Sequence, residues 1–134
     1  MQGVKEIHAL MDEYKERVRV VCVYIVEAHA ADEWPVGNKV SFCEQPKTLD
    51  ERVKLANQFV RQHGLRAPLL VDTMNNCFQK SFSAWPFRFY AVTRTQSSLH
   101  SQWRVTFKAQ PDGQLFGYDW TQLHNWLAQL PFDT

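Results

Sequence analysis

The sequence contains no long hydrophobic run. Its longest apolar stretch, residues 20–26, is far too short to cross a bilayer, which takes about 20 apolar residues. The first residues, MQGVKEIH, also lack the apolar centre of a secretion signal. We therefore predict a cytoplasmic protein with no membrane segment in these residues.

An excess of charge of one sign is also absent. The chain has 15 Lys and Arg against 14 Asp and Glu, a net charge of +1, and the basic residues are scattered. Proteins that bind nucleic acid or anionic membranes usually carry a basic patch. We therefore predict no nucleic-acid partner.

Cysteine is scarce and unpatterned. Cys22, Cys43 and Cys77 form no CxxC pair and show no His/Cys metal spacing. We therefore expect neither a disulfide scaffold nor a zinc site, and no other metal. Free thiols in a reducing compartment are expected.

The composition and the spacing of hydrophobic residues predict one α/β domain over residues 1–134. The hydrophobic content of 45% is ordinary, and the aromatic content of 13% is high. Hydrophobic spacing and turn residues predict helices and strands in mixed order. The predicted helices are 4–17, 48–64, 75–82 and 121–130, and the predicted strands are 18–26, 68–72, 87–93 and 102–109.

Residues 18–26, VRVVCVYIV, are the centre of this prediction. Their nearly continuous β-branched content is typical of an interior parallel strand buried on both faces. The strand stops at Glu27 and His29, and Trp34 follows within a polar and aromatic stretch, residues 27–47. Long loops in small domains are usually functional, so we interpret 27–47 as an insertion around a site.

Local signals mark the remaining elements. Thr48 and Glu51 match a capping box, and Gly64 ends the helix that they begin. Asp72 is interpreted either as a pocket residue at a strand end or as a cap of the next helix. Pro86 precedes a strand, where a turn is required, and is a candidate for a cis peptide bond.

The order of these elements resembles the thioredoxin-like redoxins, in which a proline precedes two antiparallel strands and a closing helix. Within them, VYIVEAHAADEW resembles the signature of the iodothyronine deiodinase family. Supporting segments are QPKTLDERVKLANQF, LLVDTMNN and PFRFYAV, so the resemblance runs from the first residue to the last helix.

The resemblance implies a site and a reaction. Tyr24, Glu27 and His29 would surround a selenocysteine or cysteine nucleophile, and Arg88 would lie near the substrate. The implied activity is reductive dehalogenation of an iodothyronine-like aromatic, or reduction of a peroxide. No cofactor is implied beyond an external reductant, either a small thiol or thioredoxin, and a homodimer stays open.

Two departures from the family pattern stand out. Pro46 occupies a position where many members have a second histidine. The nucleophile and the central strand that precedes it are absent, and the family pattern puts the nucleophile roughly two helical turns before Met1. We hypothesise a truncated reading of a longer gene, in which a selenocysteine codon was taken as a stop. The strands 18–26 and 87–93 would then leave a gap between them or pair directly.

Each candidate residue also has a purely structural interpretation. Tyr24 is an ordinary core aromatic, His29 a surface histidine, and Arg88 a member of an ion pair. Trp34 either walls an aromatic pocket or covers the end of the sheet, and Cys43 is either a resolving thiol or a free loop cysteine. The alternative function is accordingly a non-catalytic thioredoxin-fold module that binds a partner.

Overall fold

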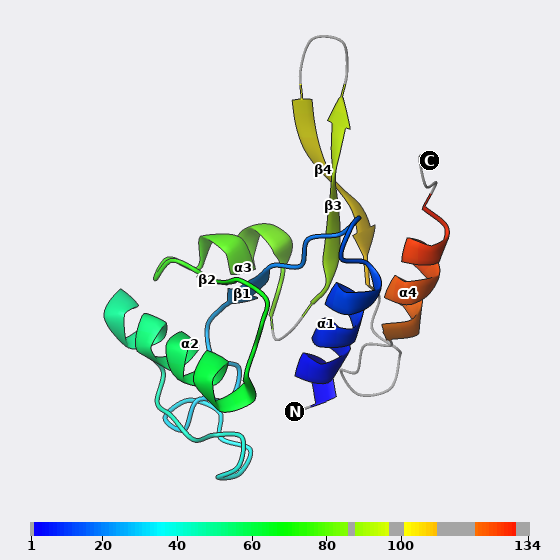
Figure 1. The fold of residues 1–134 in the computed structure, drawn as a ribbon. Helices are drawn as coiled ribbons and strands as arrows, with labels where there is room; N and C mark the ends of the chain where they lie inside the picture. The colour runs from blue at the N-terminus through cyan, green and yellow to red at the C-terminus, as the bar shows by residue number, and fades with distance from the viewer. Residues whose placement is uncertain (1, 86–87, 97–100, 110–119, 131–134) are drawn as a thin grey trace. The chain divides into compact units, whose positions relative to one another are not determined.

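A computed structural model describes residues 2–85, 88–96, 101–109 and 120–130, in which helices and strands alternate as far as β3 and β3 is followed directly by β4 (Figure 1). The chain divides into two compact units, Met1–Pro86 and Phe87–Thr134. The first contains helix α1 (Gln2–Glu13), strand β1 (Cys22–Tyr24), helix α2 (Leu49–His63), strand β2 (Leu69–Val71) and helix α3 (Cys77–Phe82). The second contains strands β3 (Tyr90–Gln96) and β4 (Ser101–Lys108) and helix α4 (Trp120–Ala128). This mixed order confirms the predicted α/β, thioredoxin-like fold class, while one domain over residues 1–134 stays a prediction.

The core of the first unit lies where α1, the end of α2 and the start of β2 meet. Val4, Leu65 and Ala67 are buried there. The partly buried side chains packed around them are Ile7, Met11, Val20, Cys22, Phe59, Val60 and Leu69. The apolar stripe of α1 is therefore used as predicted, although the helix ends at Glu13, four residues before its predicted end.

The helix α2 begins and ends as the sequence predicts. The Thr48 side chain accepts a hydrogen bond from the Glu51 backbone N–H, and the Glu51 carboxylate accepts one from the Thr48 backbone N–H. Gly64 adopts a left-handed conformation with φ of 61°, which a residue with a side chain adopts only with strain. The capping box and the glycine stop are both confirmed.

The prediction of a long interior strand at 18–26 is wrong in length and burial. Only Cys22–Tyr24 forms a ladder, parallel to β2, and Val21 is 51% exposed. Among the described residues, β1 is bonded to β2 alone and β3 to β4 alone. A β-branched run is fully buried only when strands flank it and other layers cover it, and β1 has one such neighbour here. The expected arrangement of residues 18–26 and 87–93 relative to one another stays a prediction, because these segments belong to different units.

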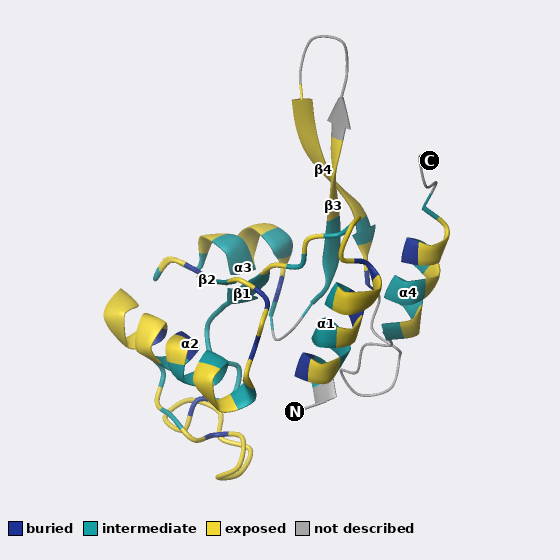
Figure 2. Ribbon diagram, viewed as in Figure 1, coloured by how far each residue is buried: buried dark blue, intermediate teal, exposed yellow. Residues whose placement is uncertain are grey.

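The second unit is an antiparallel hairpin with a helix. The strands β3 and β4 pair from Tyr90 opposite Lys108 to Gln96 opposite Ser101, with an irregularity between Ala91 and Val92. The helix α4 contributes Trp126, whose ring centroid lies 5.3 Å from that of Phe107. Most of β4 is nevertheless exposed (Figure 2).

Some predictions lie outside the described residues, among them the conformation at Pro86. None of the described helices is long and apolar enough to cross a membrane.

Candidate active site at the carboxyl ends of β1 and β2

The candidate site lies where the two parallel strands of the first unit end. Tyr24 pairs with Val71, and the backbone N–H of Asp72 donates to the Tyr24 carbonyl at 2.8 Å. Because parallel strands present their carboxyl ends at the same edge, Tyr24 and Asp72 leave the sheet side by side. The insertion begins directly after β1, so its first residues start from this edge.

Tyr24 and Glu27 are joined by a hydrogen bond from the phenol to the carboxylate Oε1. Burial raises the pKa of Tyr24, and the hydrogen bond and negative charge of Glu27 raise it further, while Arg52 acts in the opposite direction. The phenol is therefore a proton donor at neutral pH, and Glu27 is the acceptor that it orients.

His29 is held by the insertion and not by Glu27. Its Nδ1 lies 3.3 Å from the carbonyl oxygen of Trp34. A carbonyl can only accept, so this contact requires the hydrogen on Nδ1 and makes Nε2 the acceptor of the neutral ring. No hydrogen bond joins Glu27 to His29 among the described residues, so the imidazole is oriented by the Trp34 carbonyl.

Gln45 ties the end of the insertion to Glu27, and sequence reasoning gave it no role. Its side-chain Oε1 accepts from the Glu27 backbone N–H at 3.0 Å, and its Nε2 donates to the Glu27 carbonyl at 3.0 Å. The Gln45 backbone N–H donates to the Asp32 carboxylate at 2.7 Å, and Nε2 also reaches Glu33 at 3.1 Å. The amide thus satisfies Glu27 as a neighbouring strand would, which fixes the backbone beneath the Tyr24–Glu27 contact.

Arg52 is a second residue that the sequence analysis did not find. It is only 2% exposed, and its Nη1 donates to the carbonyls of Asp72 at 3.2 Å and Thr73 at 2.7 Å. Its Nε has no hydrogen-bond partner among the described residues. The helix α2 therefore places a buried positive charge at the carboxyl end of β2, where it also acts on Tyr24.

Asp72 caps the first turn of α3 from outside the helix, because the side chain at the N-cap position, Asn76, makes no capping hydrogen bond. Its Oδ1 accepts from the backbone N–H groups of Thr73 and Phe78, and its Oδ2 accepts from that of Gln79. Burial alone would raise the pKa of Asp72, but these donors and the Arg52 charge outweigh it and lower the pKa below the ordinary value of 3.8. Of the two interpretations of Asp72, the contacts favour the helix cap.

Two of the three thiols of the chain have raised pKa values. Burial raises the pKa of Cys22. Burial also raises the pKa of Cys43, and the negative charges of Glu27 and Asp32 add to the effect. Both residues are therefore thiols, not thiolates, at neutral pH.

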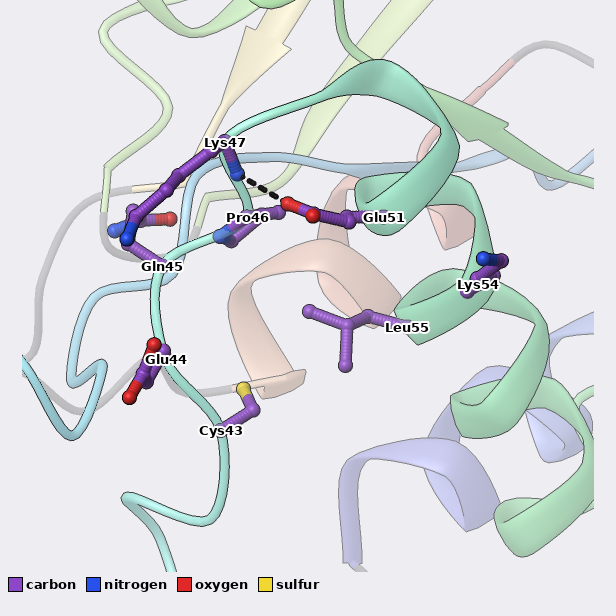
Figure 3. A pocket seen from close by; sticks show the side chains of 8 residues that line it. All are labelled: Cys43, Glu44, Gln45, Pro46, Lys47, Glu51, Lys54 and Leu55. Atoms are coloured by element: carbon purple, nitrogen blue, oxygen red, sulfur yellow. Dashed lines mark hydrogen bonds between the residues drawn. The ribbon is translucent and has the colours of Figure 1, made fainter.

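An open pocket of about 360 Å³ lies beside Cys43, between the end of the insertion and the start of α2 (Figure 3). Its lining residues are Cys43, Glu44, Gln45, Pro46, Lys47, Glu51, Lys54 and Leu55. The Lys47 backbone N–H donates to Glu51 at its rim. Gln45, which binds the backbone of Glu27, also lines this pocket. Neither Tyr24 nor His29 lines it, so the pocket is separate from the candidate site. The described residues contain no cluster of three or more metal-ligating side chains.

The remaining predicted site residues are Trp34 and Arg88. Trp34 stands at the surface of the insertion, 56% exposed, with its ring against His29. Arg88 is half-buried in the second unit. Its role at a substrate stays a prediction.

Comparison with known proteins gives a consistent result. A family model described as iodothyronine deiodinase matches residues 1–130. A type I iodothyronine deiodinase of Xenopus laevis is 31% identical over 87 residues, which are 65% of this chain and 34% of that protein. Thyroxine 5-deiodinases of Ovis aries and Gallus gallus are 26% and 25% identical over 129 residues, 96% of this chain and 40% and 46% of theirs. The chain thus spans less than half the length of these curated relatives.

Proposed function

Because the chain belongs to the iodothyronine deiodinase family, we propose that Tyr24, Glu27 and His29 form the proton-handling part of a deiodinase-type active site. The observation that carries this proposal is the hydrogen bond from the Tyr24 phenol to the Glu27 carboxylate at the end of β1. A partly buried phenol and a carboxylate two residues before an imidazole supply the groups that general acid–base catalysis needs.

The proposed reaction is the reduction of an aryl iodide by two thiols. A thiolate or selenolate attacks the iodine atom, the carbon–iodine bond breaks, and its electron pair stays on the ring carbon, which takes up a proton. A second thiol then attacks the sulfur or selenium, and iodide leaves as the disulfide or selenosulfide forms. The two electrons come from oxidation of the nucleophile and of the external thiol or thioredoxin to that disulfide or selenosulfide. His29, once protonated at Nε2, supplies the proton to the ring carbon and then takes up the proton that the second thiol releases, while its Nδ1–H stays on the Trp34 carbonyl.

The nucleophile of this reaction is proposed to lie outside these 134 residues. A thiolate, not a thiol, is the reactive species, and the raised pKa values of Cys22 and Cys43 make both poor candidates. Cys77 makes no side-chain contact with the Tyr24–Glu27 pair among the described hydrogen bonds. The upstream reading frame of the gene is the direct place to look for a Cys or selenocysteine codon.

The test is a thiol-dependent deiodination assay on the longer gene product, beside the 134-residue chain. We expect Glu27→Gln and His29→Asn to lower kcat by about 100-fold each, the lower end of what a positioned acid or base contributes. Glu16→Gln, which removes an exposed carboxylate of the same unit, should leave kcat unchanged. An unaltered kcat in both site variants would contradict the proposal. The same assay with hydrogen peroxide in place of the aryl iodide tests peroxide reduction.

A non-catalytic binding module is the alternative, and the raised pKa values of Cys22 and Cys43 favour it for the chain alone. It predicts neither deiodination nor peroxide reduction by either form of the protein. Turnover by the longer product would exclude it.

A further inference from the structure

Two tryptophans and a histidine form an aromatic surface next to the end of β1. The rings of Trp34 and Trp85 are stacked, with an interplanar angle of 20° and centroids 6.3 Å apart. The His29 ring lies against that of Trp34, with centroids 5.1 Å apart and an angle of 58°. All three residues belong to the first unit, and Trp85 had no predicted role.

The backbone fixes the position of Trp34 although its ring is exposed. The N–H groups of Glu33 and Trp34 both donate to the carbonyl of Ala30, at 3.2 and 3.1 Å, and Ala30 is itself buried. This turn holds the indole beside His29, and the His29 Nδ1 contact to the Trp34 carbonyl closes the same loop. Trp34 thus combines a defined backbone with an uncovered ring.

Packing among the described residues does not explain an anchored backbone combined with an exposed ring. Core tryptophans are covered, whereas Trp34 leaves 56% of its surface in water while stacked on a half-buried indole. Trp103 is also exposed, at 67%, but none of the described rings stacks on it. A flat, anchored and open aromatic surface is what a planar ligand ring stacks on.

We infer that Trp34 and Trp85 bind an aromatic ring of the substrate by stacking, so that a substituent of that ring lies next to His29. The nature of the ring, a halogenated phenol, rests on the proposed function, whereas the stacking surface does not. Asp32 and Glu33 precede Trp34 and carry negative charge at the surface, so a neutral phenol suits this surface better than a carboxylate or a phenolate. A peroxide has no ring to stack and gains nothing from these two indoles.

The test uses the 134-residue chain and 4-iodophenol, which is neutral at pH 7. Iodine in contact with an indole quenches its fluorescence, so binding appears as saturable quenching during a titration. We expect Trp85→Ala to weaken binding about tenfold and Trp85→Phe, which keeps a stacking ring, to stay within about threefold of the original chain. Trp103→Phe is the matched control, because it removes an exposed indole from the other unit, and it should not change the dissociation constant.

Three results would overturn the inference. Quenching that rises linearly without saturation in the original chain would mean collision and not binding. Equal affinity of Trp85→Ala and the original chain would remove Trp85 from the site. Competition by cyclohexanol as strong as that by phenol would show a generic apolar surface and not a ring site. If the alanine variant at Trp85 does not fold, Trp34→Ala, at a position that is 56% exposed, makes the same comparison and should also weaken binding about tenfold, and equal affinity of that variant and the original chain would overturn the inference.

The binding experiment is independent of the missing nucleophile, so the two proposals can fail separately. Saturable binding without deiodination by the longer product would remove the proposed function and leave the ring site standing. Deiodination without saturable binding by the 134-residue chain would leave the function standing and remove the ring site.

Discussion

The two strand pairs of this protein are held together in different ways. The parallel pair β1–β2 has three residue pairs, and buried polar side chains, Arg52 and Asp72, cluster at its carboxyl end. The antiparallel pair β3–β4 has seven, and on β4 nearly every side chain is exposed. The short pair depends on side chains that arrive from other elements, and the long pair depends on its own ladder. The candidate site lies at the end of the shorter ladder.

The physical reason lies in how the backbone groups are satisfied. A hairpin satisfies its inner N–H and C=O groups by local pairing. At the end of β2 the carbonyls of Asp72 and Thr73 instead accept from a guanidinium, and Glu27 is satisfied by the Gln45 amide. Substitutions should therefore cost much in the first pair and little in the second.

Arg52→Met tests the largest expected effect. The substitution keeps an apolar stem but removes the buried guanidinium and leaves the carbonyls of Asp72 and Thr73 without their donor, so we expect a loss of about 2–4 kcal/mol in the free energy of unfolding. Urea denaturation measures it. Arg61→Met, at an exposed position of the same helix, is the control and should stay within about 0.5 kcal/mol. Equal stability of the two variants would show that Arg52 does not hold β2.

Asp72→Asn should have the next largest effect, about 1–2 kcal/mol at pH 7, because an amide offers one acceptor oxygen where the carboxylate offers two. The folded-state pKa of Asp72 lies below 3.8, so its contribution is present above that value and is lost as the pH falls through the folded pKa. Urea midpoints between pH 7 and pH 2.5 should therefore fall less steeply in Asp72→Asn than in the original chain. Parallel acid limbs would contradict the pKa shift, and Asp50→Asn, at an exposed site, is the control.

Gln45→Ala should cost about 1 kcal/mol, because the side chain is only partly buried and water can replace it. Its effect should be local. Hydrogen exchange of the Glu27 amide should become faster, while that of Asp72, which donates to the Tyr24 carbonyl, should stay slow. Asn57→Ala, which removes an exposed side-chain amide from α2, should change neither exchange rate. Unchanged exchange at Glu27 would show that Gln45 does not hold this backbone.

The smallest expected effect is the coupling between the side chains of Thr93 and Thr106 on the hairpin. Their hydroxyl oxygens lie 2.7 Å apart across β3 and β4, at exposed positions. A double-mutant cycle with Thr93→Val and Thr106→Val should give a coupling of about 0.2–0.5 kcal/mol. A coupling as large as the Arg52 effect would break the contrast between the two strand pairs.

The parts of the fold that the sequence predicts correctly are those set by neighbours along the chain. Thr48, Glu51 and Gly64 act within one helix, and their motif contains all that is needed to locate its ends. The extent of β1 was overestimated because pairing depends on Leu69 and Leu70, which are distant in sequence. A run of β-branched residues indicates strand propensity but not how many neighbours the strand has.

The candidate site also contains residues that neighbours along the chain identify and residues that they do not. Tyr24 and Glu27 lie close in sequence, and a motif carries them together. Gln45 and Arg52 bind backbone groups of distant segments, and backbone partners leave no pattern in side-chain types. Arg52 did leave one signal, because it lies four residues before Ala56 on the apolar stripe of α2, where a charged residue needs an explanation.

The pairing of Cys22 with Leu69 also has a consequence for how the protein acquires its shape over time. The insertion and the whole of α2 lie inside the loop that this pairing closes, whereas β3 and β4 are close neighbours in sequence. Hairpins form within about 1–10 μs, and distant strand pairings are slower because closing a long loop costs chain entropy before any contact compensates for it. We therefore expect the edge that carries Tyr24 and Glu27 to assemble after the hairpin when the full chain refolds from denaturant, so that the candidate site forms late.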